Sequence, residues 1–410
     1  MKNNFFLFRF INKANILIKI FLKSNKNWSL PSKSKLLLYD AFENNFLIEF
    51  LKPWRPSMFH ARGEEIYVVV LFLSLFKFKN LREAYLDTFI ELVNPSLIIT
   101  FNDNAKIFYS ISERFKNVKT LFIQNGWRAY YGDIFEYMDT VNNADLVSLN
   151  VDYKMFFGKI NSNHFSSYLL NGKNKSVGSI LNNHYIKRLE KEKDLVIFIS
   201  QWSSSDFKTL KNNISKDDFF KPTDYFILNF LNEYCEKKSM RLKILLRNSP
   251  TKNTKDSNLV KIEKEYYQGL VAKNLDFITT DKNFNSYDAT DTAEVVVGSE
   301  STLLYESIAR GNKTAIFSIR DDLLSKSNCN EFFKIKGFTF GWPGKFPSKG
   351  FFWTNYASNE DLLFILNNLT QMSHEEWREK LKDFSFDSLM TYDPGNKIIT
   401  SFLADQLGSS

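Results

Sequence analysis

The sequence predicts an α/β fold built from two Rossmann-like domains, each with a parallel sheet, that face each other across a cleft. In both halves of the chain, short apolar runs alternate with segments of helical periodicity, which is typical of parallel βαβ units. The clearest unit is residues 295–318, where a buried strand, a hydroxyl-rich turn, a helix and a second strand follow one another. The length of 410 residues is sufficient for two domains, each with its own core.

The first half contains an alternating series of expected strands and helices. Residues 81–93 and 105–115 have helical patterns, whereas residues 66–76 are apolar enough for a buried helix or a buried strand. Strands are expected at residues 35–39, 96–101, 119–124 and 145–150. These elements predict an N-terminal Rossmann-like domain over residues 35–185, preceded by a separate segment at residues 1–34.

The second half repeats the alternation. Residues 171–193 are rich in glycine, asparagine and mixed charge, and they predict the connection between the domains. Strands are then expected at residues 194–200, 241–247, 275–279, 295–297 and 314–319, and helices at residues 223–237, 259–272, 302–310, 359–369 and 374–383. The predicted second domain spans residues 190–385, and residues 386–410 form a C-terminal tail.

The net charge of +8 is concentrated at the N-terminus, where residues 1–35 hold eight basic side chains and no acidic one. On a helix, the basic residues of segment 2–23 fall within an arc of roughly 120°, which predicts a basic amphipathic helix. Its internal charges make it a poor transmembrane span, and no signal-peptide cleavage site follows it. Two interpretations stay open: this helix lies on an anionic membrane surface, or it packs on the first domain. We expect a cytoplasmic protein, either free or peripheral on the inner face of the cytoplasmic membrane.

Composition and motifs exclude several kinds of site. The two cysteines lie far apart and the four histidines lack ligand spacing, so neither a disulfide scaffold nor a His/Cys metal site is expected. No basic patch interleaved with aromatic residues stands out beyond the N-terminus, so nucleic acid is not expected as a partner. The GxGxxG, GxxxxGK[ST], GxSxG and HExxH motifs are absent, as is a DxD motif at a strand end. We therefore expect no metal and no cofactor.

The turn after the strand at residues 295–297 carries the hydroxyls of Ser299, Ser301 and Thr302. A helix start presents NH groups without internal partners and a positive dipole end, so these hydroxyls can cap the helix or help to seat a phosphate. Glu306 lies one turn further on, on the same helical face as Thr302. It can neutralise the dipole or accept hydrogen bonds from ribose hydroxyls, and this segment alone leaves both interpretations open.

Ligands of open parallel sheets bind beyond the carboxyl ends of the strands, so other polar residues there complete a predicted donor site. Arg247 ends the strand at residues 241–247, and its guanidinium offers paired donors to a phosphate and can stabilise it as it departs. A surface ion pair is the alternative for this side chain. The predicted donor site comprises Gln201, Arg247, Ser299, Ser301, Thr302 and Glu306.

The strand ends of the first half carry a second group of polar residues. Asp103 and Asp133 are candidate general bases, because a carboxylate within hydrogen-bond reach can deprotonate an attacking hydroxyl; turn formation is the alternative for each. Arg128 is expected to bind an anionic sugar or acceptor, or to pair with Asp133. Trp127 could stack on a sugar face, although core packing is the commoner role of aromatic rings. The predicted acceptor residues are Asn104, Gln124, Asn125 and Arg128.

Three segments resemble known glycosyltransferase sequences. Residues 295–318, VVVGSESTLLYESIARGNKTAIFS, resemble the carboxyl-domain signature of the GT-B superfamily. Residues 96–109, SLIITFNDNAKIFY, and 118–135, VKTLFIQNGWRAYYGDIF, are similar to motifs of bacterial surface carbohydrate biosynthesis proteins. The resemblance covers about residues 95–320. It implies that Ser299, Ser301 and Thr302 hold the donor phosphate, with Glu306 at the ribose or a nearby donor group.

The hydroxyl-rich turn is also similar to that of transferases that use CMP-activated acidic sugars. The KxHP-type motif of those enzymes is missing here, and residues 247–250, RNSP, stand in that region. A CMP-linked acidic sugar is therefore one of the donors that the resemblance leaves open.

Residues and resemblance together predict a metal-independent glycosyltransferase. It would move a sugar from a nucleotide-sugar donor on the second domain to a surface polysaccharide or lipid-linked acceptor on the first. Asp103 or Asp133 would act as base if the reaction inverts, whereas a retaining reaction needs no such base. The alternatives are a non-hydrolysing sugar-nucleotide epimerase of the same fold and a non-catalytic scaffold that binds nucleotide and docks on a membrane.

Overall fold

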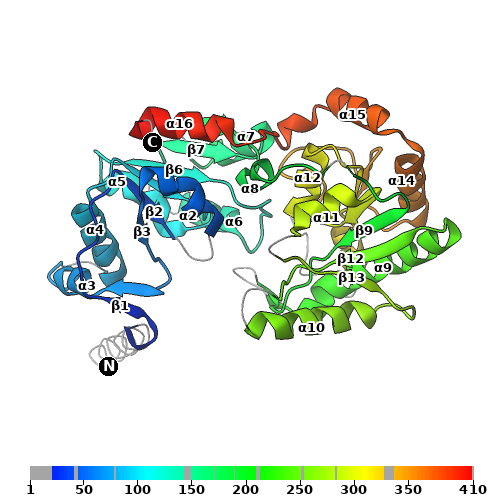
Figure 1. The fold of residues 1–410 in the computed structure, drawn as a ribbon, viewed down its shortest axis with the longest axis horizontal. Helices are drawn as coiled ribbons and strands as arrows, with labels where there is room; N and C mark the ends of the chain where they lie inside the picture. The colour runs from blue at the N-terminus through cyan, green and yellow to red at the C-terminus, as the bar shows by residue number, and fades with distance from the viewer. Residues whose placement is uncertain are drawn as a thin grey trace.

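The computed structural model describes residues 21–40, 45–77, 80–142, 149–169, 171–188, 190–208, 213–250, 254–281, 284–326 and 337–408. Nearly all of the predicted N-terminal amphipathic helix, and most of the strand expected at residues 145–150, lie outside these ranges. The described chain contains two six-stranded parallel sheets with helices packed against them (Figure 1). The predicted fold class is therefore confirmed.

The first sheet has the strand order β3-β2-β5-β6-β7-β8. Alternate strand residues point to opposite faces: Leu37 and Ile98 belong to one buried cluster, and Leu38 and Ile99 to another. Because both faces are covered, the central strands are apolar throughout, as their sequences indicated. The strands are β2 (Leu36–Tyr39), β3 (Ser57–Phe59), β5 (Leu97–Thr100), β6 (Lys119–Ile123), β7 (Tyr153–Phe156) and β8 (Lys173–Ser176).

Helices of the first half pack on both of these clusters. The predicted helix at residues 81–93 is α4, with the same bounds. Residues 66–76, which suited a helix or a strand, contain both, because β4 (Glu65–Tyr67) pairs with β1 (Asn25–Asn27) and leads into α3. The helices are α2 (Asn45–Leu51), α3 (Val68–Ser74), α4 (Leu81–Val93), α5 (Ile111–Arg114), α6 (Ile134–Asn142), α7 (Lys159–Ser166) and α8 (Ile180–His184).

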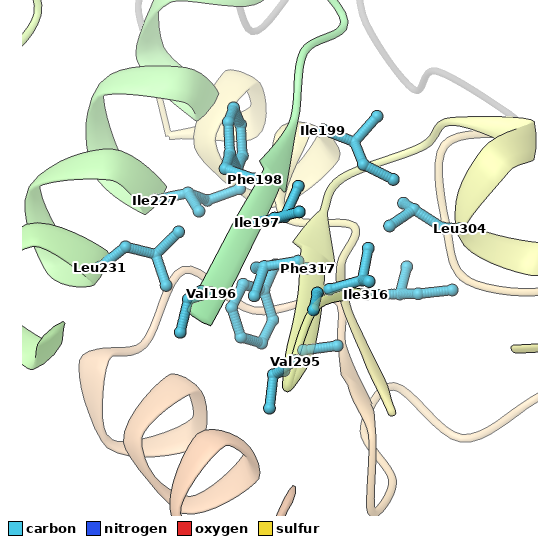
Figure 2. Close-up of a cluster of buried hydrophobic side chains, with 14 of the residues drawn as sticks. Val196, Ile197, Phe198, Ile199, Ile227, Leu231, Val295, Leu304, Ile316 and Phe317 are labelled. Atoms are coloured by element: carbon cyan, nitrogen blue, oxygen red, sulfur yellow. The ribbon is translucent and has the colours of Figure 1, made fainter. Parts of the chain in front are cut away.

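The second sheet has the order β13-β12-β9-β14-β15-β16. Its central strands bury Val196, Phe198, Val295 and Ile316 among helix side chains such as Leu231, as Figure 2 shows. The strands are β9 (Leu195–Ile199), β12 (Arg241–Leu245), β13 (Asp276–Ile278), β14 (Val295–Gly298), β15 (Thr314–Phe317) and β16 (Trp353–Thr354), with a small hairpin of β10 (Phe207–Lys208) and β11 (Asn213–Ile214) beside them. The strands expected from the sequence at residues 194–200, 241–247, 275–279, 295–297 and 314–319 are all present.

The five helices expected in the second half are present with changes at their ends, whereas α11 and α13 were not expected. The helix expected at residues 223–237 begins earlier, at Lys216, because the Ser215 hydroxyl caps it by accepting a hydrogen bond from the Asp218 NH at 3.1 Å. No described helix has the length and apolar character needed to cross a membrane. The helices are α9 (Lys216–Lys237), α10 (Thr254–Gln268), α11 (Ser286–Thr292), α12 (Thr302–Ala309), α13 (Arg320–Ser325), α14 (Asn359–Gln371) and α15 (His374–Asp383).

The chain passes between the two halves twice. The segment predicted as the connection, residues 171–193, contributes β8 and α8 to the first half before it enters β9. After α15 the chain returns, and α16 (Lys397–Leu407) packs Ile399 and Leu403 on one face of the first sheet (Figure 1). Residues 386–410, set apart as a tail in the sequence, thus include a helix of the first half's core, and the predicted domain boundaries themselves stay predictions.

Candidate active site

A cavity of about 670 Å³ lies at the carboxyl ends of the strands of the second sheet. This volume is within the range of ~300–1,000 Å³ that small-molecule sites occupy. The polar lining comes from the ends of β9, β12, β13 and β14 and the start of α12, and Trp127 reaches the cavity from the first half. Four of the residues predicted for donor binding line this one cavity: Gln201, Arg247, Ser301 and Thr302.

The turn between β14 and α12 is held close to the strand end. A Cβ on Gly298 would lie 3.0 Å from the side-chain methyl group of Leu304, so a larger residue here would press on the first turn of α12. Ser301 is the N-cap and accepts from the Leu303 NH at 3.3 Å, which confirms the capping interpretation. The Thr302 hydroxyl accepts from the Trp127 NH at 2.9 Å. Both hydroxyls therefore already contact protein NH groups while they line the cavity.

A buried carboxylate, Glu263 of α10, ties together the ends of β9 and β12. It accepts hydrogen bonds from the Ser200 hydroxyl, from the Arg247 NH at 2.9 Å and from the Asn248 NH at 3.1 Å. The Asn248 side chain donates a fourth, at 2.7 Å. Glu263 thus fixes the backbone of Arg247, while the exposed Arg247 guanidinium lines the cavity and forms no ion pair with a described residue.

On the other side of the cavity, buried Arg320 positions two lining residues. Its Nε and Nη2 donate to the Glu300 carboxylate at 2.9 and 2.8 Å, and Nη2 also donates to Gln201 Oε1 at 3.3 Å. The guanidinium packs on the rings of Phe219 and Phe220, with its carbon 4.5 and 5.0 Å from the ring centroids. Glu300 Oε1 has no hydrogen-bond partner among the described residues, so one buried oxygen in the lining can still accept a donor.

Ser299 and Glu306, the other two residues predicted for donor binding, lie outside this lining. Ser299 is buried, and its hydroxyl has no partner in the described part of the chain. The Glu306 carboxylate accepts from the hydroxyls of Ser179 and, at 3.2 Å, Tyr287. Burial raises the pKa of Glu306, and these two hydrogen bonds oppose the rise. Glu306 therefore links α12 to the N-cap of α8, which precedes the passage between the halves.

The residues predicted as bases form an ion cluster in the first half. Both oxygens of Asp103 accept from Arg128, and Arg128 Nη1 lies 3.6 Å from Asp133 Oδ2. Asp103 is fully buried, whereas Asp133 is partly accessible. Burial raises the pKa of Asp133, and the charge of Arg128 opposes this rise. Arg128 thus pairs with Asp133, which was one of its two predicted roles, and it pairs more closely with Asp103.

The three remaining acceptor candidates occupy different positions. Gln124 is buried and its amide is used on both sides: Oε1 accepts from the Phe157 NH at 3.0 Å, and Nε2 donates to the Gly126 carbonyl at 3.0 Å. Asn125 is exposed in the loop after β6. Asn104 is exposed and lines a second, smaller cavity at the end of the first sheet. The structure thus does not bring the predicted acceptor residues into one site.

Sequence reasoning missed Glu263, Glu300 and Arg320. Arg320 directly follows the strand expected at residues 314–319, so the rule that identified Arg247, polar residues at strand ends, could also have found it. Glu300 lies within the turn that the sequence analysis did single out. Glu263 gave no signal, because nothing in a helix of mixed charge tells which acidic residue faces a sheet.

Comparison with solved structures identifies the fold. The wall teichoic acid polymerase TagF has a TM-score of 0.50 at 10% identity, with 92% of this chain and 90% of that chain covered. MnaA of S. aureus, solved with UDP, has 0.49 at 11% identity (92% and 98% covered), and sucrose-phosphate synthase from Thermosynechococcus elongatus has 0.49 at 12% (92% and 99%). The likeness to TagF, at 10% identity, concerns the fold alone, which is GT-B.

Sequence comparison identifies the family. No curated protein matches the chain in sequence. A family model described as "putative O-antigen biosynthesis protein" matches residues 121–407, more than two thirds of the 410 residues. The matched region contains the whole second sheet, all of the 670 Å³ cavity lining, and Arg128 with Asp133, whereas Asp103 lies before it. The chain therefore belongs to this family of O-antigen biosynthesis proteins, on a GT-B fold.

Proposed function

We propose that the protein is a glycosyltransferase, which moves a sugar from a nucleotide-activated donor to a surface polysaccharide or lipid-linked acceptor. The observation that carries the proposal is the 670 Å³ cavity, where Arg247 and the N-terminus of α12 lie at the ends of β12 and β14, the two strands that flank β9. A guanidinium and a helix N-terminus both favour negative charge, and together they suit the phosphates of a nucleotide sugar.

In this proposal, the protein speeds the reaction by stabilising the negative charge that develops on the departing phosphate. Arg247 and the α12 NH groups bind it more strongly as charge develops on it, which lowers the barrier. Of the two carboxylates predicted as bases, Asp133 is the more accessible, and it is the base we propose if the reaction inverts. Glu300 is better placed than Glu306 for a ribose hydroxyl, because it lines the cavity and keeps an unpartnered oxygen.

A thermal shift experiment with UDP, GDP, CDP and CMP tests donor binding. Stabilisation rises with ligand affinity, so one of the four nucleotides should raise Tm more than the others, and CMP would favour an acidic sugar donor. No shift with any nucleotide would overturn the proposal. Transfer assays with and without EDTA then test metal independence. Nucleotide binding without transfer, but with epimerised donor sugar, would favour an epimerase. Nucleotide binding without any turnover would favour a scaffold.

We further propose that the protein meets an anionic membrane through residues 2–23. Exposed apolar side chains of α3 and the turn after it support this, since Phe72, Leu75 and Phe76 face solvent in the same half of the chain. Binding to vesicles with phosphatidylserine should decrease in a Lys13→Gln/Lys19→Gln variant and at high salt. Equal binding of variant and wild type would contradict the membrane role.

A further inference from the structure

A second cavity, of about 260 Å³, lies at the carboxyl end of the first sheet. Tyr39 and Asp40, at the end of β2, line it together with Asn102 and Asn104, which follow β5. The remaining polar lining is cationic and comes from Arg62, Arg82 and Lys106. This is the ligand-binding end of a parallel sheet, and of these residues only Asn104 was predicted to take part in binding.

The charge of the lining favours an anion. Three cationic side chains face one carboxylate, a net charge of +2. Arg62 neutralises Asp40, with Nε and Nη2 at 3.3 and 3.2 Å from Oδ2, so Arg82 and Lys106 supply the excess. Lys106 is held in place, since its Nζ lies 4.2 Å from the centroid of the Tyr137 ring. Neither Arg82 nor Lys106 forms an ion pair with a carboxylate of the described residues.

Asp40 gives the cavity a hydrogen-bond acceptor. The residue is 4% exposed and has a left-handed backbone, with φ of 60°. Its Oδ2 accepts from Arg62 and, at 2.7 Å, from the Asn102 amide, whereas Oδ1 has no partner within the described ranges. A buried carboxylate oxygen without a donor is costly, and a ligand hydroxyl would satisfy it.

We propose that this cavity binds a sugar that carries an anionic group, either phosphate or carboxylate. Arg82 and Lys106 would bind the anionic group, while Asp40 and the Asn102 and Asn104 amides would bind sugar hydroxyls. That this sugar belongs to the acceptor rests on the proposed glycosyltransferase function; the binding itself does not. If the protein is a glycosyltransferase, its acceptor is then a sugar that carries a phosphate or a carboxylate.

Calorimetric titration of the full chain with glucose 1-phosphate, glucuronate and glucose tests this inference. The phosphorylated or the carboxylated sugar should bind and neutral glucose should not, and the two anionic probes separate the two sources of charge. The Arg82→Gln/Lys106→Gln variant should bind the anionic sugar roughly a hundredfold or more weakly, because it loses the charge-assisted hydrogen bonds of two side chains. Lys116→Gln, at an exposed lysine outside the cavity, is the control and should bind like wild type.

An Asp40→Asn variant should change the affinity for anions in the opposite direction, towards tighter binding. Asparagine tolerates the left-handed backbone, so the fold should persist, while the cavity loses its negative charge. Inorganic phosphate should bind more tightly to this variant than to wild type. Equal binding of glucose and glucose 1-phosphate, no binding of either anionic sugar, or an unchanged affinity in the double variant would each overturn the inference. Nucleotide binding at the larger cavity, measured in the same samples, reports separately on the proposed function.

Discussion

The indole ring of Trp127 lies flat on the phenol ring of Tyr305, with ring centroids 3.9 Å apart and 4° between the planes. Trp127 follows β6 of the first sheet, and Tyr305 lies on α12 after β14 of the second. The Trp127 backbone NH also donates to Thr302, and its indole NH donates to the Trp342 carbonyl at 2.8 Å. Because Trp127 also lines the 670 Å³ cavity, the docking of the two halves and the proposed nucleotide site share this residue.

Replacing Trp127 by alanine should therefore lower both stability and nucleotide binding. Trp→Ala in a core costs ~3–5 kcal/mol, and the partial exposure of Trp127 places the expected loss near the lower end, at about 3 kcal/mol. Thermal unfolding followed by circular dichroism, with and without nucleotide, measures both effects. Trp28→Ala is the matched control, because Trp28 is 71% exposed. Equal losses in the two variants would contradict a docking role for Trp127.

Arg247→Gln should weaken nucleotide binding by roughly ten- to a hundredfold without a large loss of stability. The charged hydrogen bond to phosphate is worth about 1.5–3 kcal/mol, whereas among the described residues the exposed guanidinium makes one long hydrogen bond, 3.4 Å to the Trp202 carbonyl. Arg241, at the opposite end of the same strand, pairs with Glu192 at 3.0 Å and provides the control Arg241→Gln. Titration calorimetry should separate the two variants, and a similar affinity in both would count against phosphate binding by Arg247.

Strands that are buried on both faces were the part of the fold that the sequence predicted best. β9 and β14 are apolar and β-branched, and they begin and end within one residue of the expected positions. β8 was missed because its sequence, KNKS, is polar and largely exposed at the edge of the first sheet. An edge strand buries little, so its hydrophobic pattern carries no signal.

For the candidate site, the sequence predicted which residues lie at the strand ends, but it did not predict their hydrogen-bond and ion-pair partners. The rule that ligands bind at strand ends placed Gln201 and Arg247 in one cavity lining before any contact was known. It also placed Asp103 and Arg128 at strand ends of the first half, but the expected partner of Arg128 was Asp133, and its pairing with both Asp103 oxygens was not predicted. Such pairings depend on loop conformations and on how the two halves dock, and neither has a periodic signature in the sequence.

Glu263→Gln should weaken the larger cavity indirectly, because Glu263 does not line the cavity but holds the backbone of Arg247, which does. In the variant an NH2 group replaces one carboxylate oxygen and faces donors that it cannot accept from. These donors are the Asn248 NH and side-chain amide at one oxygen position, and the Ser200 hydroxyl and Arg247 NH at the other. The hydrogen bonds lost are worth about 1.5–3 kcal/mol. We expect a lower Tm together with weaker nucleotide binding, because Arg247 loses its fixed backbone. Glu265→Gln changes an exposed residue on the same helix and should leave both quantities unchanged. A variant that loses stability but keeps its nucleotide affinity would show that Glu263 does not position Arg247.

Asp224 should make the stability of the protein depend on pH. This buried carboxyl of α9 accepts from the Tyr266 hydroxyl at 3.0 Å, and burial raises its pKa from 3.8 to about 7, although the charge of Arg320 opposes the rise. Between about pH 4 and 7 the unfolded chain releases this proton while the folded protein keeps it, so this group's contribution to stability falls as pH rises.

The change amounts to roughly 4 kcal/mol over the full range and ends above the folded pKa of about 7. Asp224→Asn removes the titrating group, so urea unfolding at pH 5 and pH 7.5 should show the variant gaining on wild type at the higher pH. The control Asp217→Asn, an exposed position of the same helix, should shift stability equally at both pH values. If the difference between Asp224→Asn and wild type is the same at pH 5 and pH 7.5, then Asp224 is not a carboxyl that stays protonated in the folded protein.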